Sequence, residues 1–292
     1  MTKRNSKQGN QPAYLDTSIL FVRAFGHPLQ KRSVMAAVGS RRRAISKYSL
    51  TEVKNQACGL IDFYFILQDE ESLGDALLVA NSRWGRFPKL ASAAVARMLD
   101  ATGSKAQALA SLANVIFAYI LMSHSFVSEL IDDDLGCPLS DAEFSDEPGL
   151  TTAEIFLRFR ESYRCEINDP PRCNQDGFRV RNARNIDLIR SDSISKNAGV
   201  KKVQVFLTKL KDGNPVHARG LKHRCYKIGD LMIALQCPRK YLIVTSDAAF
   251  ADFARVLRRD CQLLPSLAAL LSQRSAPLSP VKTVASESGL GA

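Results

Sequence analysis

The sequence of 292 residues lacks several patterns that identify common classes of protein. It has no Gly-rich phosphate-binding loop and no serine in a nucleophile elbow, which argues against P-loop nucleotide hydrolases and α/β-hydrolases. No two of its seven cysteines have the CxxC spacing of common zinc ribbons. No long Gly/Ser- or Pro-rich linker divides the chain, so we expect one elaborated domain rather than two independent ones.

An export signal and a membrane anchor are not indicated either. The first residues, MTKRNSKQGNQP, are polar and basic with no apolar stretch behind them. The cysteine count is odd, so we expect reduced thiols in a cytoplasmic protein. Residues 106–128 carry no charge, but Gln, Ser, Asn and His interrupt the run. We interpret this segment as a buried core helix, not as a membrane span.

Positive charge is the clearest compositional feature, with a net charge of +11. Lys and Arg gather in residues 1–54 and 158–240, whereas residues 132–147 are acidic. A basic surface suits a polyanion such as nucleic acid, although either basic run alone can be an ordinary solvated surface. Within the first run we expect nucleic-acid contacts from Arg41, Arg42, Arg43 and Lys47.

Two carboxylates follow buried strand patterns. Asp16 comes after the apolar run AYL, and Asp247 follows YLIVTS, with a helical pattern after each. If the two strands are parallel neighbours, both acids lie at the carboxyl edge of the sheet, where ligand sites form in open α/β folds. Two further acids fall on predicted helices. Glu52 lies three residues after a candidate cap at Ser49, and Asp230 lies near the start of a helix over 228–237.

Four carboxylates crowded together cannot all stay ionised without a counter-charge. Mg²⁺ or Mn²⁺ supplies that charge, prefers oxygen ligands and can activate water for phosphodiester hydrolysis. Each acid also has a plain structural interpretation, as a helix cap or a first-turn acid favoured by the helix dipole. Taken singly, that interpretation is favoured. The joint pattern of the four acids and their order along the chain favour the metal site.

Four segments in order resemble the acidic motifs of PIN-domain ribonucleases. They are LDTSIL at 15–20, SLTE at 49–52, GDLMIAL at 229–235 and IVTSDAAF at 243–250. The resemblance implies an α/β/α sandwich around a parallel sheet, a Mg²⁺ or Mn²⁺ site and cleavage mainly of RNA, while DNA stays open. Asp16, Glu52, Asp230 and Asp247 would be metal-holding catalytic acids. Thr17 and Thr245 would support them.

The resemblance also implies a division of the chain. Residues 13–69 and 220–272 would form the nuclease core, residues 1–12 a disordered basic arm and residues 273–292 a disordered tail. Residues 70–219 would be a mainly helical insertion, far longer than the connection in small members of the family. That insertion could bind a regulatory partner or a second copy of the chain.

Two alternatives come from other classes of protein. One is a PIN-like module that binds nucleic acid or protein without cutting. The other is a zinc-stabilised DNA-binding regulator. Cysteine and histidine side chains for such a zinc site occur at Cys165, Cys173, His217, His223 and Cys225, but scattered reduced thiols explain them more simply.

Overall fold

A computed structural model describes residues 11–84, 104–132, 135, 137, 143–144, 147–163, 175–193, 195–211 and 220–275. The strands are β1 (Ala13–Leu15), β2 (Arg43–Ser46), β3 (Glu129–Ile131), β4 (Leu242–Thr245) and β5 (Cys261–Leu263). The first helices are α1 (Thr17–Phe25), α2 (Pro28–Val38), α3 (Lys47–Asp69), α4 (Leu73–Trp84), α6 (Lys105–Ser125) and α7 (Thr152–Ser162). The later ones are α8 (Gln175–Arg181), α9 (Ala183–Ser191), α10 (Ala198–Lys211), α11 (Gly220–Gln236), α12 (Ala248–Val256) and α13 (Leu267–Ser275).

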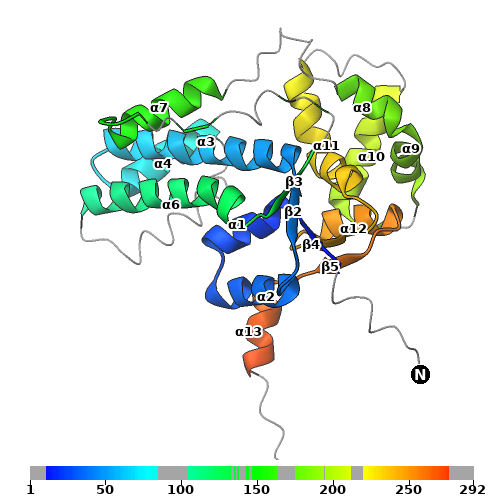
Figure 1. The fold of residues 1–292 in the computed structure, drawn as a ribbon. Helices are drawn as coiled ribbons and strands as arrows, with labels where there is room; N and C mark the ends of the chain where they lie inside the picture. Colours follow the sequence, from blue (N-terminus) through cyan, green and yellow to red (C-terminus); the bar gives the residue numbers. More distant parts are fainter. Residues whose placement is uncertain are drawn as a thin grey trace, which may run out of the picture.

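The five strands form one parallel sheet in the order β3-β2-β1-β4-β5. Alternate side chains of a strand point to opposite faces, and both faces of this sheet are covered. On one face, Leu15, Ile45 and Val244 join a core with residues of α1, α3 and α6. On the other, Tyr14 and Ile243 join a core with residues of α11 and α12. The α/β class expected from the sequence is therefore confirmed (Figure 1).

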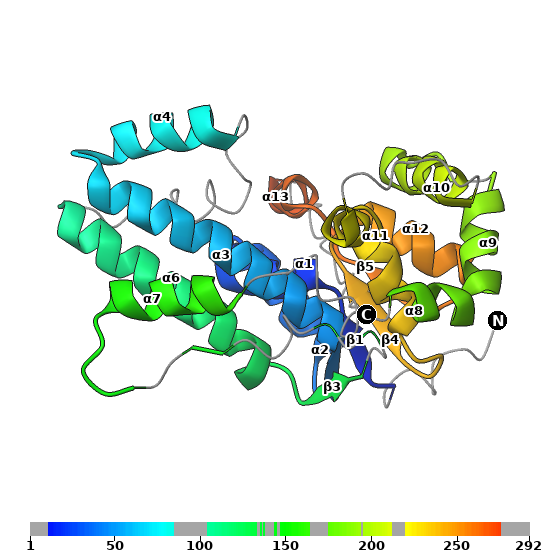
Figure 2. The same cartoon turned by 90° about the horizontal axis from the view of Figure 1, so that it is seen from above.

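The helices that cover the two faces form two separate groups (Figure 2). Helices α3, α4, α6 and α7 extend away from the sheet on one side, and α8, α9 and α10 gather around α12 on the other. Most of these helices come from residues 70–219. Those residues also supply β3, which adds an edge strand beside β2. The sheet therefore contains residues from both the expected core and the expected insertion.

Three expectations about local structure are wrong. The uncharged segment 106–128 was expected to be one core helix, but α6 ends at Ser125 and residues 129–131 form β3, which pairs with β2. The helix expected over 228–237 begins instead at Gly220, so Asp230 lies in the middle of α11 and not near its start, since the apolar pattern that predicted the helix starts only at Ile228. The cap of α3 is Ser46, not Ser49, since β2 passes directly into the helix.

Helix α6 is the one helix, within the parts of the chain that the structure describes, that is long and apolar enough to cross a membrane by length and composition. Its residues Leu112, Ile116 and Tyr119 are fully buried in the first core, where α6 packs along α3. The Tyr119 ring also makes an edge contact with Phe25 of α1. This packing is that of a core helix on its inner face, while Leu121 on the outer face is exposed.

The expected terminal arms lie mostly outside the described residues, which begin at Gln11 and end at Ser275. The last two residues of the expected basic arm are part of the fold. The Pro12 carbonyl accepts a hydrogen bond from the Leu242 amide at 2.9 Å, and the Gln11 side chain donates to Asp260. At the other end, α13 continues three residues past the expected end of the core and contacts α2.

Candidate active site

The strand order of the parallel sheet reverses at β1. From β1 the chain builds outward to β2 and β3 on one side and to β4 and β5 on the other. Open parallel sheets bind ligands at such a reversal, beyond the carboxyl ends of the central strands. Asp16 follows β1 directly, and Asp247 comes two residues after β4, the neighbouring strand. The structure thus places both strand-end acids at the reversal.

Asp16 forms the buried floor of this edge, with 3% of its surface exposed. Although it precedes α1, its side chain makes no capping hydrogen bond. Instead its Oδ2 accepts from the Ser18 hydroxyl at 2.5 Å and from the Thr245 hydroxyl at 2.8 Å. Burial raises the pKa of Asp16 above its ordinary value, and the charge of Asp247 adds to the increase, while the two hydroxyl groups oppose it. Asp16 thus holds the N-cap position of α1, while its carboxylate is held mainly by the two hydroxyl groups.

Thr245 connects the two strand-end acids. Its hydroxyl is fully buried, donates to Asp16 and accepts from the Asp247 amide at 2.9 Å. Ser18 adds a second link, because its hydroxyl accepts from the Ser246 amide at 3.1 Å while donating to Asp16. Thr245, for which a supporting part was expected, thus hydrogen-bonds to the Asp16 side chain and to the Asp247 backbone. Ser18 was not anticipated, although it stands inside the same LDTS segment.

Asp247 sits at the exposed rim and has a structural part in the fold. One carboxylate oxygen, Oδ1, accepts from the Ala249 amide at 2.6 Å and from the Phe250 amide at 3.2 Å, which caps α12. The residue is solvent-exposed. Both capping bonds use Oδ1, which leaves Oδ2 for other groups. Asp247 can therefore cap α12 and hold a metal ion at the same time.

Glu52 approaches from α3, in the second turn of the helix. The Ser46 hydroxyl caps α3 by accepting from the Ser49 amide at 3.0 Å, so Glu52 is not needed in a capping box. Its Oε2 accepts from the Thr17 hydroxyl at 2.7 Å, the support expected from Thr17. Burial raises the pKa of Glu52, and the charges of Asp230 and Asp16 raise it further. Glu52 therefore lies within electrostatic reach of two of the other three acids.

Asp230 enters from α11, which lies on the opposite face of the sheet from α3. The preceding residue, Gly229, brings the two helices together: a Cβ at this position would stand 2.5 Å from Glu52 Oε1. Asp230 itself lies at the rim and is exposed to solvent. Partial enclosure by the surrounding protein nonetheless raises the pKa of its carboxyl group, and the charges of Asp16 and Asp247 contribute.

The four acids therefore form one electrostatic cluster, with Asp16 and Glu52 inside and Asp230 and Asp247 at the rim. In the described part of the chain, no three His, Cys, Asp or Glu side chains stand close enough to form a finished metal site. The cluster thus offers carboxylates to a cation rather than a preformed coordination shell. Its donors are all oxygen, and the pKa values of Asp16, Glu52 and Asp230 are raised, which fits a hard divalent ion such as Mg²⁺ or Mn²⁺.

The basic residues expected to bind nucleic acid do not gather at this site. Arg41, Arg42 and Arg43 stand where β2 begins, at the edge of the sheet opposite to the acids. There Arg42 pairs with Glu129 at 2.9 Å and donates to the Tyr241 hydroxyl, while the Arg43 guanidinium covers the Phe126 ring. Lys47, at the other end of β2, lies at the acidic edge and faces Asp132 at 3.5 Å.

The zinc hypothesis concerns residues that the structure mostly leaves out. Cys165, Cys173 and His217 lie outside the described residues. His223 and Cys225 belong to α11, and only their backbone is described. The structure therefore bears on neither the zinc site nor the regulator built around it.

Comparison of the chain with protein-family models, curated proteins and solved structures gave no match. What the acidic cluster does must therefore be inferred from its own residues.

Proposed function

We propose that the chain is a PIN-like, metal-dependent nuclease that hydrolyses phosphodiester bonds at the cluster of Asp16, Glu52, Asp230 and Asp247. The observation that carries the proposal is the convergence of these four acids, from two strand ends and two helices, at the reversal of the parallel sheet. Neighbouring carboxylates with raised pKa values favour a divalent cation as their counter-charge. The net charge of +11 suits a polyanionic substrate.

The inner and the outer acids of the cluster would have different roles. Hydroxyl groups of Ser18 and Thr245 hold Asp16, and that of Thr17 holds Glu52, so both inner carboxylates are oriented before any ligand binds. Asp230 and Asp247 at the rim face the solvent from which a substrate would arrive. A bound Mg²⁺ or Mn²⁺ would lower the pKa of an attacking water and offset negative charge on the phosphate. RNA is the proposed substrate on the resemblance alone.

The test compares wild type with Asp16→Asn and Asp230→Asn on labelled single-stranded RNA and DNA, each with Mn²⁺, Mg²⁺ or EDTA. We expect metal-dependent cleavage that both substitutions reduce by at least about 100-fold, since each removes a charge from the cluster. Asp187→Asn is the matched control, because Asp187 is an exposed acid on α9 that pairs only with Arg190 of its own helix among the described residues. Cleavage that survives both substitutions would overturn the proposal.

A wild-type protein that binds nucleic acid without cutting it, in either metal, would favour the silent PIN-like module instead. Thermal unfolding with and without Mn²⁺ separates these cases further. A ligand that binds the folded state alone raises the unfolding temperature. The proposal expects Mn²⁺ to stabilise wild type and to have less effect on Asp230→Asn.

A further inference from the structure

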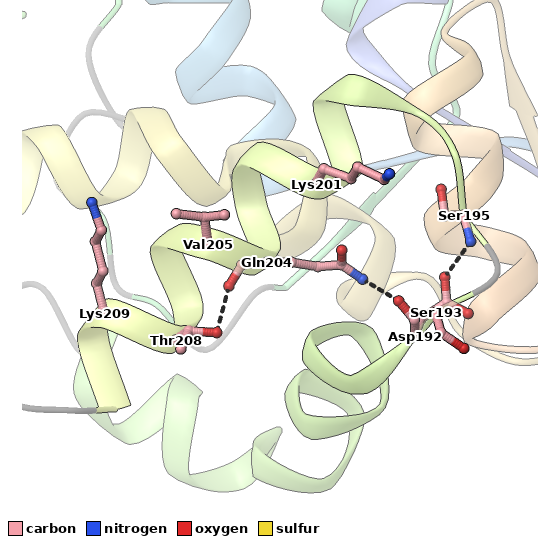
Figure 3. A pocket seen from close by; sticks show the side chains of 8 residues that line it. All are labelled: Asp192, Ser193, Ser195, Lys201, Gln204, Val205, Thr208 and Lys209. Atoms are coloured by element: carbon pink, nitrogen blue, oxygen red, sulfur yellow. Dashed lines mark hydrogen bonds between the residues drawn. The ribbon is translucent and has the colours of Figure 1, made fainter.

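A second polar feature lies outside the acidic cluster, between α10 and the segment that joins it to α9. It is an open cavity of about 540 Å³. All but one of the residues that line it have a polar or charged side chain, and two are lysines; the residues are Asp192, Ser193, Ser195, Lys201, Gln204, Val205, Thr208 and Lys209. Figure 3 shows Lys209, Thr208, Gln204 and Lys201 following one another along α10, with Ser193 and Ser195 opposite. The volume is in the range of small-ligand pockets.

The wall opposite α10 is held by specific hydrogen bonds. Gln204 donates through Nε2 to the carbonyl groups of Ile189 at 2.8 Å and Asp192 at 2.7 Å, which fastens α10 to the end of α9. The Ser195 hydroxyl, 4% exposed as a residue, donates to Asp252 of α12 at 2.8 Å. The cavity is therefore part of the folded structure and not a gap between loose segments.

The charge inside the cavity is unbalanced. Its one acid, Asp192, accepts from the Ser195 amide at 3.0 Å and lies 3.8 Å from the Arg255 guanidinium. Lys201 and Lys209 are exposed, and neither forms an ion pair with any residue that the structure describes. Eight residues of helix separate them by about 12 Å along the axis of α10, so the two ammonium groups can contact different phosphates of one strand.

The cavity is linked to the acidic cluster through α12. Three residues between α9 and the first turn of α10 contact α12: Asp192 lies near Arg255, Ser195 bonds to Asp252, and Gly199 lies against Ala249. Gly199 lies so close that a Cβ there would stand 2.9 Å from that of Ala249, in the first turn of α12. Asp247 caps that same turn. The end of α10 that carries Lys201 therefore adjoins the rim of the acidic cluster.

We propose that this cavity binds the phosphate backbone of a single-stranded nucleic acid next to the bond to be cleaved, through Lys201 and Lys209. The inference rests on the proposed nuclease function. The acidic cluster repels phosphates, so the affinity for a strand must come from cations beside it. A groove with spaced cations on one helix fits the backbone of a single strand, which such grooves track without reading its sequence.

The test measures binding of a fluorescent single-stranded RNA of about 12 nucleotides by anisotropy, over a range of salt concentrations. All variants carry Asp16→Asn, so that the RNA is not cut during the measurement. In Lys201→Gln/Lys209→Gln, we expect about tenfold weaker binding, and the slope of log K against log salt should fall by about 1.4, the value for two lost phosphate contacts. Lys202→Gln is the matched control, since Lys202 is exposed on α10 but does not line the cavity.

A parallel cleavage assay uses wild type and the same lysine variants without Asp16→Asn. The double variant should raise KM for the 12-nucleotide RNA and leave kcat within about twofold, because the lysines hold the flank and not the reacting atoms. If the double variant and the Lys202→Gln control bind RNA equally well, the cavity is not a nucleic-acid site. The same follows if an acidic peptide displaces the RNA as effectively as unlabelled RNA does at the same concentration. If wild type does not cleave but the double variant still loses binding, the cavity proposal stands and the nuclease proposal fails.

Discussion

Gly229 and Glu52 meet where two helices from opposite faces of the sheet come together. A Cβ on residue 229 would stand 2.5 Å from Glu52 Oε1 and 3.3 Å from the Tyr48 hydroxyl. Real side chains do not approach so closely, so glycine is the residue that lets α11 lie against α3 at this point. Asp230 is the next residue of α11. The position of one acid relative to another thus depends on a residue that has no side chain.

Gly229→Ala is therefore expected to damage the acidic cluster without removing any carboxylate. The new methyl group must displace either the Glu52 carboxylate or the whole of α11. A displacement of about 1 Å at a catalytic group can lower the rate about 100-fold. We expect a loss of at least about tenfold in Mn²⁺-dependent cleavage, measured under single-turnover conditions.

The control for this substitution lies within α3 itself. A Cβ on Gly59 would have no atom within 4 Å, and alanine favours helix over glycine by about 1 kcal/mol. Gly59→Ala should therefore keep full cleavage and raise the free energy of unfolding slightly. Equal activity of Gly229→Ala and Gly59→Ala would show that the contact with Glu52 does not matter to the chemistry.

Thr245→Val should uncouple the two strand-end acids. The change keeps the shape of the side chain but removes the hydroxyl that donates to Asp16 and accepts from the Asp247 amide. A buried group left without its hydrogen-bond partner costs about 1–3 kcal/mol. Urea unfolding should show a loss of that size together with reduced cleavage. Thr245→Ser keeps the hydroxyl and should retain most of both, and a serine variant as damaged as the valine variant would point to packing instead.

The stability of the metal-free protein should fall as the pH rises. Burial raises the pKa of Glu52 from its ordinary 4.5 to about 8, so between these values the folded state binds more protons than the unfolded state. By linkage, the contribution of Glu52 to the free energy of unfolding is full below about pH 4.5 and is lost as the pH rises from there through about 8. The loss is at most about 1.4 kcal/mol per pH unit. Thermal unfolding in EDTA at pH 5.5, 7 and 8.5 measures it. Glu52→Gln should flatten the dependence.

The effect of a metal ion on stability should also depend on pH. Mn²⁺ binds ionised carboxylates, so it competes with the protons on Glu52 and Asp230. The increase in unfolding temperature caused by Mn²⁺ should therefore be larger at pH 8.5 than at pH 5.5. An increase that is the same at both values would mean that the ion binds elsewhere.

The sequence predicted the parts of the site that depend on local patterns. Asp16 and Asp247 follow short apolar runs that become β1 and β4, and the structure pairs these strands as parallel neighbours. The prediction succeeded because buried strands in a parallel sheet are apolar throughout, which is visible in a few residues. Glu52 and Asp230 were candidates only through the joint pattern of the four acids and the resemblance, since nothing in either helix shows which part of the sheet it will cross.

What the sequence did not show depends on contacts between distant residues. Strand β3 follows a long apolar helix and is only three residues long, with Leu130 46% exposed, so no alternation marks it as an edge strand. Gly229 matters only because α11 crosses α3 at this residue, and the sequence does not show that crossing. The run from Arg41 to Arg43 looks like a phosphate-binding patch, but its place at the opposite edge follows from the direction of β2.

The N-cap of α3 is Ser46 in the structure, whereas the sequence pattern suggested Ser49. The Ser46 hydroxyl accepts from the Ser49 amide at 3.0 Å at the start of α3, while the Ser49 hydroxyl contacts only that of Ser46 among the described residues. Ser46→Ala should lower the free energy of unfolding by about 1 kcal/mol, as expected for a lost N-cap, and Ser49→Ala by less. Glu52 lies one turn further along α3, so fraying of the first turn should also weaken the stabilisation by Mn²⁺. If Ser49→Ala has the larger effect on both, the helix starts where the sequence pattern placed it, and Glu52 belongs to its cap rather than to the acidic cluster.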